Sequence, residues 1–282
     1  MPSLASHRDT SRLAALLRPG MREHLERELL PRYLGTRRWY AAKDAGPPSA
    51  RIVQAETFAH AGGAALLALV RAVPFGQPPQ TYFLPLALSA RPPRDDRSLI
   101  GTLSLEGEPH HLIDALADDA CTRALVAAMR DAAPDAAPRG AVRFMRTRAF
   151  PGGVELADAP IARPHSEQSN SSLTVAGMML KAFRRVHPGV HPEIEMTGYL
   201  TERTEFRHFA RLLGALELIA PDGAATVVCA LQALIPNQGD GWTVAVNALE
   251  RVARGETRPA QARLIALAAQ LGARTAELHR AL

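Results

Sequence analysis

A single lysine in an apolar segment is the first feature of this sequence that could do chemistry. Only two of the 33 basic residues are lysines, Lys43 and Lys181, and the second lies between Leu180 and Ala182. An ammonium group is a compact charge on a flexible stem, which suits a phosphate oxygen in a narrow site. The alternative is a lysine on the exposed face of a half-buried strand, since strand alternation exposes every second side chain.

Polar side chains lie immediately upstream of this lysine. The stretch EQSNSS (167–172) and the apolar run that follows it predict a β-hairpin with a polar first arm and tip. A tight polar turn can donate backbone N–H groups and hydroxyls to phosphate, as a glycine-rich loop does. A cluster of Ser and Asn is also typical of an ordinary turn, and both interpretations stay open here. The candidate residues are Ser169, Asn170, Ser171 and Ser172.

An acidic helix follows the lysine segment. Pro192 suits the first turn of a helix, and Glu193 and Glu195 would lie near its positive end. The connection over 184–191 is short enough to bring these carboxylates to Lys181.

The order of elements around these residues indicates the small lobe of a protein-kinase-like fold. Hairpin, lysine strand, acidic helix, two strands and an irregular crossover follow one another. In kinase-like folds a lysine on the third strand holds the α- and β-phosphates of ATP, and a glutamate on the next helix holds the lysine. Lys181 and Glu195 fit these two roles, and Glu193, on a different helix face, is the alternative.

The remaining elements follow from periodicity and from Gly and Pro turns. Arg37-Arg38-Trp39-Tyr40 is interpreted as an anchor whose aromatics pack a loop down, with a ligand site as the alternative. The segment 132–139, AAPDAAPR, is predicted to be a Pro/Ala connector. We expect helices over 11–30, 109–131, 192–206, 244–254 and 259–282, and strands over 51–59, 65–73, 81–90, 98–107, 141–150, 161–168, 171–177, 178–186, 212–220 and 225–235.

The chain resembles the maltokinase family, ATP-dependent enzymes that make maltose 1-phosphate and are often fused to trehalose synthase. The matching stretches, in family order, are LPRYLGTRRWYAAK (30–43), HSEQSNSS (165–172), LKAFRRVHPGVHPEIE (180–195), LQALIPNQGDGW (231–242) and LGARTAELHRAL (271–282). This resemblance implies an α+β class with a small lobe similar to protein kinases and aminoglycoside phosphotransferases, preceded by a cap. The implied domains are the cap (1–105), a β-rich ATP-binding subdomain (106–235), a hinge (236–242) and the first helices of a helical lobe (243–282).

The resemblance also implies roles for individual residues. Lys181 looks like the lysine that binds the ATP phosphates, and Ser169 to Ser172 look like the turn that covers them. Gln232 to Leu234 look like the strip whose backbone meets adenine. ATP and Mg²⁺ are the implied cofactors, maltose is the implied acceptor, and trehalose synthase is a possible partner.

The catalytic groups of such a kinase are missing from the sequence. A kinase-like fold needs a catalytic-loop Asp with an Asn five residues on, and a later Asp for Mg²⁺, and nothing after Trp242 supplies either. His7-Arg8-Asp9 has the right letters, but it precedes Lys181, and Ala14 stands in the place of the Asn. We therefore expect the catalytic residues, the Mg²⁺ ligands and the sugar site to lie in a helical lobe that is largely outside this chain, which alone would be inactive.

Composition limits the other functions. The net charge is +5, but the arginines are scattered and aromatics make up 5%, which argues against a nucleic-acid platform. The longest apolar run, 64–70, is too short to cross a bilayer, and residues 1–12 lack the apolar core of a signal peptide. We therefore predict a cytoplasmic protein without a membrane partner. Cys121 and Cys229 are far apart, which predicts reduced, buried thiols.

A non-catalytic module is the competing interpretation. In that case the cap would serve as an interaction surface for a partner enzyme such as trehalose synthase. The two interpretations differ in whether the ATP-site residues are retained. Lys181, Glu195 and the Ser/Asn stretch are all present, which favours the kinase.

Overall fold

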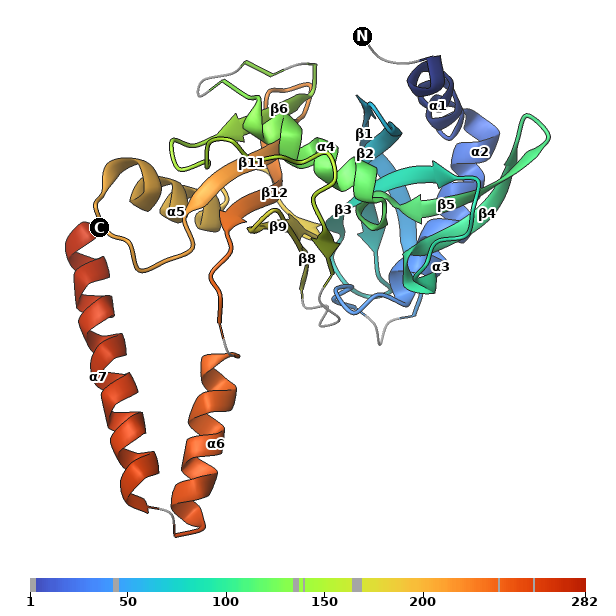
Figure 1. Cartoon of the computed structure of the whole chain (residues 1–282). Helices are drawn as coiled ribbons and strands as arrows, with labels where there is room; N and C mark the ends of the chain where they lie inside the picture. The colour runs from blue at the N-terminus through green and yellow to red at the C-terminus, as the bar shows by residue number, and fades with distance from the viewer. Residues whose placement is uncertain are drawn as a thin grey trace.

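The structure contains two antiparallel β-sheets, helices that pack beside them, and a helical hairpin at the C-terminal end (Figure 1). It is a computed structural model and describes residues 4–42, 46–133, 137–138, 140–163, 169–237, 239–255 and 257–282. The combination of antiparallel sheets with separate helices confirms the predicted α+β class.

The first sheet is covered on one face by the N-terminal helices. Its strands pair in the order β1-β2-β3-β5-β4, and β10 pairs with β3. Leu16, Leu25 and Leu30 from the helical region share one buried cluster with Leu66 and Val70 of the sheet. The elements are α1 (Leu4–Ala15), α2 (Pro19–His24), a π-helical turn (Leu25–Leu29), α3 (Leu30–Gly35), β1 (Ser49–His60), β2 (Gly63–Val73), β3 (Gln80–Ser89), a 3-10 turn (Asp96–Ser98), β4 (Leu99–Leu105), β5 (Glu108–Asp114) and β10 (Arg185–Val186).

Both faces of β2 are buried. Leu66, Ala68 and Val70 belong to the cluster under the helices, whereas Leu67 and Leu69 belong to a second core. Alternate side chains of a strand point to opposite faces. A strand that is covered on both sides therefore has a continuous apolar sequence, here ALLALV, instead of a polar/apolar alternation.

The second sheet contains the lysine segment. Its strands pair in the order β6-β11-β12-β9-β8-β7. The predicted hairpin is formed by β8 and β9 and turns at Ala176 (φ 49°) and Gly177 (φ 72°). Two successive residues with positive φ give a turn whose twist matches that of the flanking strands. The elements are β6 (Val142–Arg146), β7 (Ile161–Ala162), β8 (Asn170–Val175), β9 (Met178–Phe183), α5 (Pro192–Arg203), β11 (Leu212–Ile219) and β12 (Ala225–Ala233).

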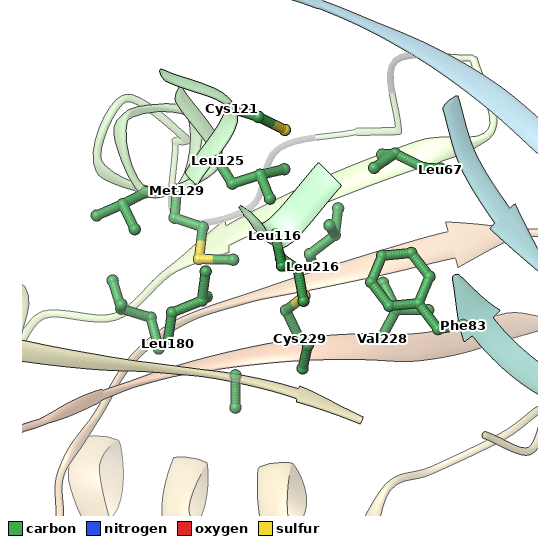
Figure 2. Packing of buried hydrophobic residues seen from close by; sticks show 14 of the residues in the cluster. Leu67, Phe83, Leu116, Cys121, Leu125, Met129, Leu180, Leu216, Val228 and Cys229 are labelled. Atoms are coloured by element: carbon green, nitrogen blue, oxygen red, sulfur yellow. The ribbon is translucent and has the colours of Figure 1, made fainter. Parts of the chain in front are cut away.

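A common apolar core joins the two sheets. Leu67 and Phe83 of the first sheet belong to the same buried cluster as Leu125 of α4 (Asp119–Arg130) and Leu180 and Val228 of the second sheet (Figure 2). Cys121 and Cys229 lie in this core as free thiols, as predicted, and burial raises the pKa of the Cys229 thiol to about 12. The first sheet therefore packs on the second through side chains, not only through a linker.

One predicted helix is wrong in its first half. The segment Glu108–Asp114 is strand β5, which pairs with β3 and β4, and a 3-10 turn (Ala115–Ala117) separates it from α4. Asp118 begins the helix because its side chain accepts hydrogen bonds from the backbone of Ala120 and Cys121. The apolar spacing of Leu112 with Leu116 imitates a helical period, but Leu112 packs within the first sheet.

The predicted aromatic anchor is confirmed. Trp39 and Tyr40 are buried, and both rings contact the ring of Tyr82 at centroid distances of 5.7 Å. The segment after α3 is thus held against the first sheet by aromatic packing.

The last two helices form a hairpin that extends away from the sheets (Figure 1). They are α6 (Gly241–Ala253) and α7 (Thr257–Ala281). The end of α7 lies next to the loop after α5, where Nε2 of His208 is 3.6 Å from Oε2 of Glu277. In the described ranges no helix has both the length and the apolarity to cross a bilayer.

Candidate functional site

Lys181 forms an ion pair on one face of the second sheet. It lies on β9 directly opposite Ser172 of β8 and Ala230 of β12. Its Nζ lies 2.6 Å from Oε2 of Glu193, and its side chain is 24% exposed. The lysine is therefore neither freely solvated nor sealed in the core, and its ammonium group can still reach a ligand.

Glu193, not Glu195, is the partner of the lysine. The structure thus corrects the predicted pair in favour of the alternative, and Glu195 is exposed. The physical reason is the start of α5 at Pro192, which turns the second helical residue toward the sheet. Two residues further on, a helix has rotated by roughly 200°, so Glu195 faces away.

Gln232 holds the second oxygen of the glutamate. Its Nε2 donates to Oε1 of Glu193 at 3.0 Å, and its side chain is buried on β12. Both carboxylate oxygens are therefore bound, one by a cation and one by an amide. The sequence predicts Gln232 as part of a backbone strip, and the role of its side chain was missed because it depends on the register of β12 against β9.

His191 completes the surroundings of the ion pair, and the sequence gives no reason to select it. It precedes α5, and its ring stacks on that of Phe183 at 4.0 Å. Burial is the main reason that its pKa is lowered; Glu193 acts in the opposite direction, and Lys181 lowers it further. A neutral imidazole adds no second positive charge beside the lysine.

The polar stretch before the lysine divides between the two faces of the hairpin. Ser172 shares a face with Lys181, because directly opposite residues of an antiparallel pair point the same way. Ser171 lies opposite Ala182, and its hydroxyl accepts a hydrogen bond from Nε of Arg184 at 2.8 Å. Asn170 begins β8 and Ser169 precedes it. The predicted polar tip is wrong, because Asn170 to Ser172 are strand residues of β8 and the hairpin turns at Ala176 and Gly177. Residues 164–168, the greater part of the predicted strand 161–168, lie outside the described residues.

The strip proposed for adenine, Gln232 to Leu234, lies at the end of β12. Leu234 is the first residue after the strand, and its backbone N–H donates to the carbonyl of Gly177 at 3.3 Å. The structure therefore brings Leu234 to the hairpin turn, at the same end of the sheet as Gln232. In this arrangement, its N–H is not directed outward to a ligand.

The arrangement can neutralise an anion. Lys181, paired with a carboxylate whose two oxygens are both hydrogen-bonded, lies opposite Ser172 and provides a charge beside a neutral donor on one partly exposed face. No group of three or more His, Cys, Asp or Glu in the described part of the chain is placed to bind a metal. These residues therefore do not form a Mg²⁺ site by themselves.

Solved structures define the class of fold. Three structures of glucosamine kinase are similar to this chain: one in complex with glucosamine, ADP and inorganic phosphate (TM-score 0.54, 21% identity), crystal form A (0.51, 22%) and crystal form B (0.52, 20%). They are matched over 94%, 94% and 89% of this chain and over 52%, 52% and 51% of their own chains. The chain has a kinase-like fold and spans about half the length of these structures.

A family match defines the N-terminal part. Residues 33–118 match the maltokinase N-terminal cap domain. The chain thus consists of a maltokinase-like N-terminal cap followed by a part with a kinase-like fold, as the sequence resemblance predicts.

Proposed function

We propose that this chain is the cap and nucleotide-binding part of a kinase that transfers a phosphoryl group from ATP to maltose. The ion pair of Lys181 with Glu193, partly exposed on the second sheet of a chain with a kinase-like fold, is the observation that carries the proposal. The match of 33–118 to the maltokinase cap supports maltose as the acceptor and maltose 1-phosphate as the product.

The residues of this chain act on the nucleotide. Lys181 neutralises oxygens of the α- and β-phosphates, and Ser172, on the same face, donates its hydroxyl to them. Glu193 and Gln232 fix the direction of the lysine. Phosphoryl transfer depends on positioning and on neutralising charge, so these residues supply binding and orientation without a covalent step.

The remaining catalytic groups belong to another part of the protein in this proposal. Asp240 is the last aspartate of the sequence, and its carboxylate caps α6 by accepting from the N–H of Thr243. The Mg²⁺ ligands, the catalytic Asp and the sugar site would come from a helical lobe that begins with α6 and α7. A cytoplasmic protein that works beside trehalose synthase fits this activity.

A phosphorus NMR assay tests the proposal. ATP, Mg²⁺ and maltose are incubated with this chain and, separately, with a polypeptide that continues through a complete helical lobe. We expect maltose 1-phosphate only from the longer polypeptide. Product from the 282-residue chain alone would overturn the assignment of the catalytic groups to another lobe. Faster transfer to glucosamine than to maltose would overturn the proposed acceptor.

A further inference from the structure

Arg184 is a buried cation next to the lysine strand. It follows β9 directly, and only 3% of its surface is exposed. Its position three residues after Lys181 places it on the opposite side of the strand. A buried guanidinium is tolerated only when its N–H groups and its charge have partners.

Its charge is balanced by the first sheet. Nη2 of Arg184 lies 2.5 Å from Oδ2 of Asp114, at the end of β5. The same oxygen accepts from the hydroxyl of Tyr33 at 3.3 Å, and Oδ1 accepts from the N–H of Leu116 at 3.1 Å. The guanidinium also lies over the ring of Trp39, 5.1 Å from its centroid. Tyr33, Trp39 and Asp114 are all within the stretch that matches the cap domain.

The backbone strengthens this connection. The N–H of Phe83 on β3 donates to the carbonyl of Arg184 at 2.8 Å, and Nη1 of Arg184 lies 3.4 Å from the carbonyl of Phe83. The chain then continues as β10, which pairs with β3. The lysine strand therefore runs directly from the second sheet into the first.

The third edge of the guanidinium contacts the hairpin. Nε of Arg184 donates to Oγ of Ser171 at 2.8 Å. Ser171 is the neighbour of Ser172, whose side chain shares a face with Lys181. One planar group thus contacts the cap through Asp114 and the polar arm of the hairpin through Ser171.

We propose that Arg184 is a positioning residue that couples the cap to the nucleotide-binding hairpin. It fixes β8 and β9 against the cap. A conformational change in the hairpin therefore alters the cap, and a change in the cap alters the hairpin. The planar fork of arginine is needed, because a lysine ammonium has no rigid set of donors to reach three partners at once. The nucleotide part of this inference rests on the proposed function, whereas the mechanical coupling does not.

Hydrogen exchange of the unliganded chain tests the coupling. In Arg184→Met, backbone amides in both 170–183 and 33–40 are expected to exchange faster by about tenfold or more, since charged hydrogen bonds are lost. Arg185→Met is the matched control, because Arg185 is the exposed neighbour, and it should leave both segments unchanged. Equal protection in the folded Arg184→Met variant and in the control would overturn the proposal.

If Arg184→Met does not fold, the variant Ser171→Ala still tests the proposal. Ser171→Ala keeps the pair of Arg184 with Asp114 and removes only the contact with the hairpin. We expect faster exchange in 170–183 with 33–40 unchanged. Protection of 170–183 equal to that of the unmodified chain would contradict a role for this contact.

ATP is then added to separate the two proposals. In the unmodified chain, ATP should slow exchange in the hairpin and also in 33–40, and Ser171→Ala should lose the effect on 33–40. Protection of the hairpin alone in the unmodified chain would overturn the coupling. Absence of any ATP effect would overturn the proposed function, while the exchange of the unliganded variants would still decide the role of Arg184.

Discussion

At the residue scale, the site depends on one ion pair, between Nζ of Lys181 and Oε2 of Glu193. Lys181 is conspicuous because the sequence uses arginine for almost every other cation. The choice between Glu193 and Glu195 depends on where α5 begins relative to the sheet, and a difference of two residues decides which carboxylate faces the lysine. Gln232 was expected only for its backbone and His191 was not selected at all, because the roles of these side chains come from strand register and ring stacking that no local sequence pattern encodes.

The two glutamates give a matched pair of variants. Glu193→Gln removes the charge that orients Lys181, so ATP affinity should fall by roughly tenfold, as expected for a lost charge-assisted hydrogen bond. Glu195→Gln changes the same chemistry at an exposed position and should leave ATP affinity unchanged. Titration calorimetry measures both. Equal losses in the two variants would contradict the assignment of Glu193.

His191 predicts how stability depends on pH. Its pKa is lowered in the folded protein, mainly by burial, so the unfolded chain binds the proton first as the pH falls. The free energy of unfolding should therefore decrease as the pH drops below about 6.5, the ordinary pKa of histidine. His191→Phe, which keeps a ring over Phe183, should flatten this decrease.

Urea unfolding at a series of pH values measures the effect of His191→Phe. His60 also has a pKa lowered mainly by burial, so part of the slope should remain. A pH dependence identical to that of the unmodified chain would show that His191 does not contribute.

At the element scale, the strands and helices that are bounded by clear proline or glycine signals were predicted well. The lysine hairpin, α5, β11 and β12 follow from alternation, a proline start and glycine turns. The error over 109–131 arose because β5 has two apolar residues at a helical distance, and pairing with β3 and β4 outweighs that local pattern. Close approaches between the backbones of neighbouring strands could not be predicted from the sequence either.

Gly214 is one such close approach. A Cβ at this position on β11 would lie 2.6 Å from the carbonyl oxygen of Met145 on β6 and 3.2 Å from Cβ of Met129. Backbone cannot yield as a flexible side chain can, so Gly214→Ala should lower the free energy of unfolding by about 1–3 kcal/mol.

Gly152→Ala is the control for this overpacking. A Cβ there would meet no atom within 4 Å, so the free energy of unfolding should change by less than about 0.5 kcal/mol. Urea denaturation of both variants gives the comparison. A loss at Gly152 as large as that at Gly214 would show that the contact with Met145 does not set the cost.

At the scale of the whole molecule, the sequence predicts two parts but not how closely they are joined. The predicted division at 105 lies between β4 and β5, which pair with each other. We propose to place the division after β5, at the turn Ala115–Ala117. Even there the parts are not independent, because Leu67 and Phe83 share a core with the second sheet and β10 returns to the first.

The helical hairpin exposes large apolar side chains. Trp242 is 80% exposed, Ile265 62% and Leu271 69%. Exposed apolar side chains on these two helices favour association, so the chain should self-associate as its concentration rises. Ile265→Arg combined with Leu271→Glu should shift the chain toward monomer in analytical ultracentrifugation. A monomer at all concentrations before mutation would contradict this expectation.

Binding of ATP to this chain tests the central claim most directly. Titration calorimetry compares the unmodified chain with Lys181→Met, and a matching thermal midpoint establishes that both are folded. We expect ATP to bind the unmodified chain and to bind Lys181→Met about 10- to 100-fold more weakly, because a charged contact with phosphate is lost. Equal affinity in the two proteins would mean that Lys181 does not bind the nucleotide and that the proposed site is wrong.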